Sequence, residues 1–458
     1  MIAFVHYIRW KIYITAPILG AFLLFMTVPV SGNESLGLRI TVVDAVRIAL
    51  AENHELKAMK SAVEAQGKDV GIARSYLLPR IFMEERYLRT TNPGYAFMAR
   101  LNQERIEQQD FNPDLLNHPD AINDFQSSLT FEQPLFVKKA FVSLDMAKTE
   151  SRAKGAEFNR KREDTAFQVV RACLTIVSAR EHLRAVDQGI EDAREHHRMA
   201  MSRYKNGLGL YADTLRTSTA LTEARQKRNV AEKNLKLAER GLGLMLAMTE
   251  SVSVEDETLD LRLRDLSYYV KCAESRSDLL AAGLREENSR HNIRLAEAGY
   301  YPYIGVGGTY QLNDHSQPFG SEGTNWQVAA FLRWDLFDGA KSAYERAKAK
   351  HLSSQAREYV SALKKGVDYR IYEAYLNAEQ AAKNAELTRE ALQTSKEGTR
   401  LVKVRYANGL SSLAELLNAQ SSLEQARAGV VERENDYKIA LATLSHESGT
   451  ILQDLKID

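Results

Sequence analysis

The chain has 458 residues, of which 26% are charged and 44% hydrophobic, a balance typical of a folded protein. Its 61 lysine and arginine residues and 60 acidic residues almost cancel, which argues against a general nucleic-acid binder because such proteins need a basic excess. The two cysteines, Cys173 and Cys272, have neither metal-site spacing nor the pattern of a disulfide framework. We expect two small apolar side chains in helix interfaces, with a single structural bridge as the alternative.

The N-terminus has the order of a secretory signal. Basic residues up to Lys11 precede an apolar run over 14–30, and the small residues Ser31 and Gly32 follow it. This order predicts a signal peptide over 1–32, with cleavage just after Gly32. The alternative is a retained membrane anchor, because an apolar run of this length nearly spans a bilayer. No later run is long enough for a transmembrane helix, so a membrane-spanning role would need strands.

The distribution of proline predicts long helices. After the signal, the prolines fall in two islands, 79–134 and 302–318, and the long stretch after each island contains none. Proline costs about 3 kcal/mol inside a helix, so these stretches, rich in Ala, Glu, Lys, Arg and Leu, are predicted to be helical. A helix over 138–203 would be about 100 Å long. The alternative, several shorter helices joined by turns, conflicts with the scarcity of glycine in 156–188. Three- and four-residue steps, typical of a coiled coil, separate Phe167, Val170, Leu174 and Val177.

Four segments around the proline islands alternate between apolar and polar residues. They are residues 81–90, 126–136, 303–312 and 326–337. In the third, for example, Ile304, Val306 and Tyr310 fall on one face, and glycine, threonine and glutamine fall on the other. Each segment has about ten residues, the length of a tilted strand that crosses a bilayer. A single segment of this kind also fits an ordinary half-buried strand, but four after a secretory signal favour the membrane interpretation.

The chain repeats itself. The motif Arg-Tyr-Lys-Asn-Gly-Leu at 203–208 recurs as Arg-Tyr-Ala-Asn-Gly-Leu at 405–410, and the similarity continues beyond both turns. Each half is predicted to run helix, strand, loop, strand, very long helix, tight turn, helix. The first half carries about 22 extra residues within 91–125, which we expect to form a long exposed loop. The predicted domains are a first repeat over 33–246, a linker over 247–269, a second repeat over 270–450 and a tail over 451–458.

Four strands constrain the assembly. They cannot close a membrane barrel alone, because the smallest spanning barrels have about eight strands and an open edge in lipid leaves backbone groups unpaired. Subunits must therefore share a barrel. Two subunits would supply eight strands and a filled interior, whereas three would supply twelve and leave a channel. The small residues Gly305, Gly307 and Gly308 favour the wider barrel.

The duplicated Arg-Tyr-x-x-Gly-Leu turn, the doubled order of elements and the secretory signal resemble the TolC family of outer-membrane efflux and export proteins. The resemblance covers about 40–450. It implies a mainly α fold with a small β part: a homotrimer with a trimeric α-barrel in the periplasm and a shared 12-stranded outer-membrane β-barrel, four strands per subunit. The function implied is a passive channel of a tripartite efflux or type I export system, without enzymatic activity or a cofactor. The partners implied are a periplasmic adaptor protein, an inner-membrane pump of the RND or ABC type, and outer-membrane lipid.

The resemblance also assigns site residues. The residues that match the periplasmic tip and its adaptor contact are Arg203, Tyr204, Gly207, Leu208, Arg405, Tyr406, Gly409 and Leu410. Asp213, Tyr406 and Glu415 match the gate and constriction, where a ring of Glu415 carboxylates would favour cations. This sequence departs from the family pattern at Ser411, where some members have a basic gate partner, and at Asn418, where a second acidic ring is expected. The alternative for Asp213 and Glu415 is that they are solvated residues favoured near a helix N-terminus.

The sequence contains no glycine-rich phosphate loop, nucleophile elbow or metal-ligand cluster. His196 and His197 are adjacent, so on a helix they point about 100° apart, and we expect them on the surface rather than around one ion. The competing function is a soluble periplasmic coiled-coil adaptor or scaffold, which would need no amphipathic strands; a periplasmic enzyme is third for want of a site. The sequence does not identify the substrate (drug, metal, peptide or protein) or the pump.

Overall fold

The computed structural model describes residues 38–255 and 261–457. The predicted signal peptide, 1–32, lies outside these ranges. The longer helices are α1 (Val42–Glu52), α2 (His54–Ser75), α5 (Lys138–Lys205), α6 (Tyr211–Met245), α7 (Leu266–Ala273), α8 (Ser277–Glu297), α9 (Lys341–Ala407) and α10 (Leu413–Glu447). None of the helices in the described ranges is both long and apolar enough to cross a membrane.

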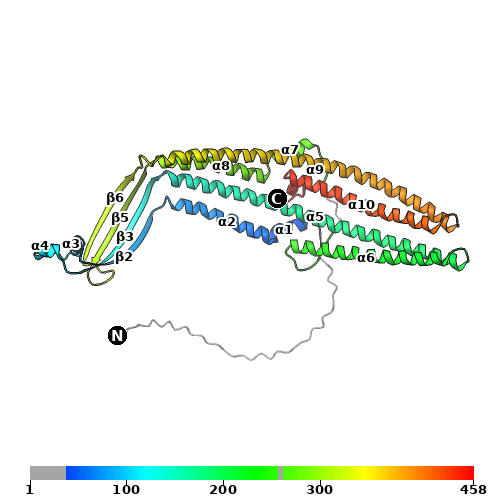
Figure 1. Cartoon of the computed structure of the whole chain (residues 1–458), viewed down its shortest axis with the longest axis horizontal. Coiled ribbons are helices and arrows are strands. Elements are labelled where there is room, and N and C mark those ends of the chain that lie inside the picture. The colour runs from blue at the N-terminus through cyan, green and yellow to red at the C-terminus, as the bar shows by residue number, and fades with distance from the viewer. Residues whose placement is uncertain (1–37, 256–260, 458) are drawn as a thin grey trace, which may run out of the picture. The chain divides into compact units, whose positions relative to one another are not determined.

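Two very long helices carry the fold. Helix α5 has 68 residues and α9 has 67, so each extends for about 100 Å. Both contain no proline, as the sequence predicts. Helix α5 packs against α6 and α9 packs against α10, which gives two helical hairpins, one from each half of the chain (Figure 1). The predicted fold class, mainly α with a small β part, is therefore confirmed.

The four long strands form an antiparallel sheet in the order β2-β3-β5-β6. Its strands are β2 (Arg80–Thr90), β3 (Ile122–Val137), β5 (Tyr303–Asp314) and β6 (Gly323–Arg333). Strand β3 leads directly into helix α5 at Lys138, so strand and helix are continuous. The register shifts between Pro134 and Phe136, where proline has no N–H to donate to the neighbouring strand. Figure 1 shows the sheet at the opposite end of α5 and α9 from the hairpin turns.

One boundary of the sheet differs from the sequence prediction. The fourth strand was expected over 326–337, but β6 ends at Arg333. The reason is that its partner β5 begins at Tyr303, paired with Arg333, directly after Pro302. Gly305 also has a local role: a Cβ there would lie 2.7 Å from the Phe331 ring. This glycine makes room for Phe331.

Most residues of the connection 91–121 are exposed, as expected for the segment 91–125, but the connection is partly helical rather than an irregular loop. It contains α3 (Pro93–Asn102), the 3-10 helix η1 (Gln108–Phe111) and α4 (Pro113–Asn117). Two of the three prolines that suggested a loop, Pro93 and Pro113, stand at the first position of α3 and α4, where a missing N–H costs nothing. Asn92 and Asn112 cap these helices by accepting hydrogen bonds from Tyr95 N and Asp114 N.

A core lies about midway along the long helices. Val169, Val170 and Ile176 of α5 are fully buried there against Val46 of α1. The predicted linker contributes to this core, since β4 (Val252–Val254) pairs in parallel with β1 (Leu38–Ile40). The predicted tail contains the short helix α11 (Ile451–Asp454), which packs against the same cluster. Both cysteines are free, as expected, and burial raises the pKa of the Cys173 thiol to about 12.

Candidate functional site at the two helical turns

The two hairpin turns have the same backbone geometry. In the first, Gly207 N donates to Tyr204 O at 3.0 Å and Leu208 N donates to Arg203 O at 2.8 Å. This pair of bonds is a Schellman motif, which ends a helix by pairing its last carbonyl groups. It needs a left-handed residue, and Gly207 has a φ of 72°. The glycine predicted for the turn is therefore required by its backbone.

The second turn repeats these bonds. Gly409 N donates to Tyr406 O at 3.1 Å, Leu410 N donates to Arg405 O at 2.8 Å, and Gly409 has a φ of 77°. The arginine side chain adds a further bond, since Arg405 Nη2 donates to Leu410 O at 3.3 Å. In the first turn the equivalent bond joins the Arg203 guanidinium to Leu208 O at 3.1 Å. The repeated motif Arg-Tyr-x-x-Gly-Leu is thus one helix-ending device used twice.

The two tyrosines of the motif have different surroundings. Tyr406 is only 3% exposed and packs against Leu413 and Leu416 of α10. Tyr204 is 43% exposed, and its ring lies 5.4 Å from that of Tyr211. The two turns are therefore equivalent in their backbone and in the bond from arginine to leucine, but their tyrosines differ.

Arg203 connects the two hairpins. Its Nη1 donates a hydrogen bond to Tyr406 O, and its guanidinium carbon lies 4.9 Å from the centroid of the Tyr406 ring. Arg405 is exposed, and its hydrogen bond in the described part of the chain goes to Leu410 of its own turn. The first turn therefore supplies the cation that holds the second.

The predicted gate residues Asp213 and Tyr406 lie near each other. Burial raises the pKa of the Tyr406 hydroxyl, the Asp213 carboxylate raises it further, and the Arg203 cation opposes both. Asp213 is half-buried in the first turn of α6. The structure thus brings Arg203, Asp213 and Tyr406 into one electrostatic group.

The other residues that the sequence analysis related to the constriction are at the start of α10. Glu415 is exposed in its first helical turn, and its backbone N donates to the capping Ser412 Oγ at 3.2 Å. Asn418 is also exposed. Ser411 differs, because its Oγ is buried and has no hydrogen-bond partner among the described residues. The exposure of Glu415 fits both a carboxylate ring at the constriction and a solvated residue at the start of a helix.

His196 was expected on the surface, and this prediction is wrong. It is 2% exposed, because α10 covers it, and its Nε2 lies 3.2 Å from Gln420 Oε1. Burial lowers its pKa. His197 instead contacts Thr217 Oγ1 of α6 through Nδ1 at 3.1 Å. The two rings therefore contact different helices and do not converge on one ion.

Polar contacts that the sequence did not reveal join α5 to α10 above the turns. Asp192 of α5 accepts hydrogen bonds from Gln420 Nε2 at 3.1 Å and Arg427 Nη1 at 2.6 Å. Burial alone would raise the pKa of Asp192, but Arg427 and Gln420 together hold it below its ordinary value. Lys403 of α9 also reaches Glu195 of α5 at 2.5 Å.

A second, more deeply buried ion cluster lies near the core. The Arg276 side chain is 1% exposed and pairs with Asp278 at 2.8 Å and with Glu447 at 3.1 Å. His446 Nε2 lies 2.7 Å from Asp164 Oδ1. Hydrogen bonds from His446 and Arg276 lower the pKa of Glu447 to about 2 although its burial opposes this. Burial lowers the pKa of His446, but its bonds to the Asp164 and Glu447 carboxylates raise it overall.

The sequence profile of the outer membrane efflux protein family matches residues 45–247 and 269–450. The chain belongs to this family. Among curated relatives, outer membrane protein TolC of Vibrio cholerae is 21% identical over 427 residues, which cover 88% of this chain and 89% of the relative. Alkaline protease secretion protein AprF of Pseudomonas aeruginosa is 21% identical over 453 residues, covering 94% of this chain and 88% of the relative.

Solved structures have the same fold. The outer membrane channel CmeC of Campylobacter jejuni aligns with a TM-score of 0.74 at 16% identity, over 90% of this chain and 86% of that one. The open state of the outer membrane channel MtrE of Neisseria gonorrhoeae aligns with a TM-score of 0.73 at 18% identity, over 90% of this chain and 89% of that one.

This member of the outer membrane efflux protein family is an outer-membrane channel of a tripartite efflux or type I secretion system, with a periplasmic extension. The family membership confirms the predicted function and location and excludes the soluble scaffold. It also makes the protein a channel rather than an enzyme.

Proposed function

We propose that three copies of the chain assemble into one passive duct. In this assembly the three sheets form a 12-stranded outer-membrane barrel and the helices form an α-barrel in the periplasm. The edges of the sheet support the proposal. Strands β2 and β6 are its two outer strands and run in opposite directions, so β6 of one copy can pair antiparallel with β2 of the next. Exposed apolar residues follow the outer strands, among them Ile81, Met83, Trp326, Val328 and Leu332.

The stoichiometry is tested by the mass of the assembly in detergent, measured by light scattering after size exclusion. Three copies per particle are expected. A single cysteine replacing Met83 in β2, combined with single cysteines along β6, should also give disulfide-linked chains in a variant lacking Cys173 and Cys272. A monomeric or dimeric particle, or the absence of any β2–β6 crosslink, contradicts the proposal.

The two hairpin turns are the proposed periplasmic entrance and adaptor contact. Leu208 and Leu410 support this, because both stand at the tips and are about 70% exposed: 71% and 69%. Large exposed apolar residues at such positions are typical of a partner surface. Leu208→Asp and Leu410→Asp should each abolish co-purification with the adaptor while the trimer remains intact. Full retention of adaptor binding by both variants contradicts this assignment.

The proposed contacts that close the entrance are made by Arg203, Asp213 and Tyr406. The proposed acidic ring consists of the Glu415 side chains of the three copies. The support for the closing contacts is that one cation, one carboxylate and one buried tyrosine from two different hairpins share a site. Contacts that join separate helical hairpins restrict how far the hairpins can separate. The channel itself uses no cofactor and no energy source, so an inner-membrane pump drives transport.

The names of two relatives suggest which system to test first. AprF of Pseudomonas aeruginosa and PrtF of Dickeya chrysanthemi are both named for protease secretion, and both align with 94% of this chain. This favours a type I export system with an ABC pump and a protein substrate over an RND drug pump. Co-purification of each kind of pump with the tagged channel distinguishes them. The proposed signal peptide, 1–32, is tested by N-terminal sequencing of the mature protein.

A further inference from the structure

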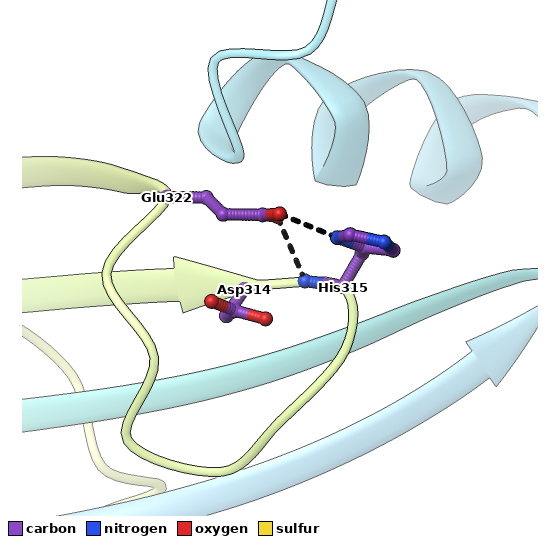
Figure 2. Close-up of side chains that lie close together, drawn as sticks. All are labelled: Asp314, His315 and Glu322. Carbon is purple, nitrogen blue, oxygen red and sulfur yellow. Dashed lines mark hydrogen bonds and ion pairs between the residues drawn. The ribbon is translucent and has the colours of Figure 1, made fainter.

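The loop between β5 and β6 contains a cluster of side chains that the channel function does not use. The loop lies at the end of the sheet that points away from the long helices (Figure 1). Figure 2 shows Glu322 reaching back from the end of the loop to His315, with Asp314 beside them at the end of β5. The ligand atoms of these three residues all lie within 4.8 Å of one another.

Asp314 is held in place by its surroundings. It is 4% exposed, and its Oδ1 accepts hydrogen bonds from Ser316 N at 2.7 Å, Ser316 Oγ at 2.8 Å and Gln317 N at 3.0 Å. All three bonds go to Oδ1, so Oδ2 has no hydrogen-bond donor among the described residues. Gly320 packs against this oxygen, since a Cβ at Gly320 would lie 2.0 Å from it. The carboxylate is thus oriented before any ligand binds.

Among the described residues, Glu322 is held by hydrogen bonds with His315. Its Oε1 lies 2.6 Å from His315 Nδ1, and its Oε2 accepts a hydrogen bond from His315 N at 3.0 Å. Neither Asp314 nor Glu322 forms an ion pair with a lysine or arginine in the described part of the chain. Two carboxylates therefore lie close together, and among the described residues the His315 imidazole is the cationic group that pairs with them. Such a site favours a bound cation.

We propose that Asp314, His315 and Glu322 bind one divalent transition-metal ion of the class to which Zn²⁺ belongs. One imidazole with two carboxylates suits this class better than Mg²⁺ or Ca²⁺, which prefer oxygen ligands alone. Ligand atoms bound to one Zn²⁺ at about 2.0–2.1 Å lie about 3.3 Å apart. The three side chains therefore need only small movements, with the ion taking the place of the proton between His315 and Glu322.

The site is also accessible. The side chains of His315 and Glu322 are 41% and 29% exposed, so an ion can enter from solvent and complete its coordination with water. A bound ion would join the first and last residues of the loop. Next to it, Thr324 N donates to Glu104 Oε1 at 3.4 Å, which connects β6 to the end of α3. In the proposed orientation this end of the sheet faces the exterior, but metal binding itself does not depend on the channel function.

The test uses the full-length channel in detergent, stripped of metal with a chelator and titrated with ZnCl₂ by calorimetry. The variants are Asp314→Asn, His315→Gln and Glu322→Gln, which conserve shape. The matched control is His118→Gln, an exposed histidine of the β2–β3 connection. We expect one Zn²⁺ per chain at this site, about tenfold or more weaker binding in each of the three variants, and unchanged binding in the control.

Absence of saturable binding, or wild-type affinity in all three variants, overturns the proposal. A second measurement covers the case in which a variant does not fold. Co²⁺ added to the stripped wild-type protein should give the visible absorption of a protein-bound ion, and Zn²⁺ should displace it. A Co²⁺ spectrum identical to that of the free aqueous ion also overturns the proposal.

Discussion

Replacing Arg203 with alanine should loosen the contact between the two hairpin turns. The substitution removes the hydrogen bond from the guanidinium to Tyr406 O and the cation–π contact with the Tyr406 ring at 4.9 Å. A hydrogen bond to a charged group contributes about 1.5–3 kcal/mol, and an exposed cation–π contact contributes about 0.5–1 kcal/mol. Because Arg203 is half-exposed, we take about 2 kcal/mol for the pair of contacts, which corresponds to about a 30-fold change in the ratio of closed to open entrances.

The assay is single-channel recording in planar lipid bilayers, with open probability as the readout. The matched control is Arg405→Ala, because Arg405 bonds the carbonyl of its own turn as Arg203 does but, among the described residues, makes no such contact with the other hairpin. Arg203→Ala should raise the open probability strongly and Arg405→Ala should not. Equal effects of the two substitutions, or an unchanged open probability in Arg203→Ala, would refute the reasoning.

Three other properties can be measured. Glu415→Gln should reduce cation selectivity, seen as a shifted reversal potential in a salt gradient; an unchanged value would favour a solvated helix-start role. Gly207→Ala should lower the free energy of unfolding by about 1–2 kcal/mol because φ there is positive, whereas Gly366→Ala, inside α9 with open space around it, should raise it by up to about 1 kcal/mol; denaturant titration compares them. Burial lowers the pKa of His446 but its hydrogen bond to Asp164 raises it overall, so its stabilising effect is complete below the ordinary value of 6.5 and is lost as pH rises through the raised one. The melting temperature of His446→Gln should therefore fall less above pH 6.5 than that of the wild type, and parallel curves would contradict this.

Local chemistry made much of the fold predictable. A helix without proline or a glycine-rich break continues, so the absence of these residues was enough to predict α5 and α9. Alternation located the strands because side chains of a strand point to opposite faces. Proline itself was ambiguous: Pro93 begins a helix, whereas Pro302 directly precedes β5 and so sets the end of β6 at Arg333. Distinguishing these roles required the neighbouring cap or strand.

Contacts between distant segments were not predictable. His196 is 224 residues from Gln420 in sequence, and Arg203 is 203 residues from the Tyr406 carbonyl that it bonds. Helical periodicity tells which face of α5 is apolar, but it does not tell which helix covers a polar residue. For this reason a buried histidine was expected on the surface. The loop cluster was missed for a related reason, since Asp314 and Glu322 are brought together only by the turn between two strands.

Ser411 differs from the family pattern described above, and the contacts of Arg203 with Tyr406 show which residue supplies a cation at this place instead. At the position where the family resemblance predicts a basic gate partner, this chain has a serine whose Oγ is buried without a hydrogen-bond partner among the described residues. A cation nevertheless lies on the Tyr406 ring, and it comes from the first hairpin as Arg203. The same arginine closes its own turn by bonding Leu208 O, so one side chain both ends a helix and links two hairpins. The two repeats contain equivalent arginines, Arg203 and Arg405. Of these two, only Arg203 links the two hairpins among the described residues, because Tyr406 is buried where Arg203 contacts it, whereas Tyr204 is exposed.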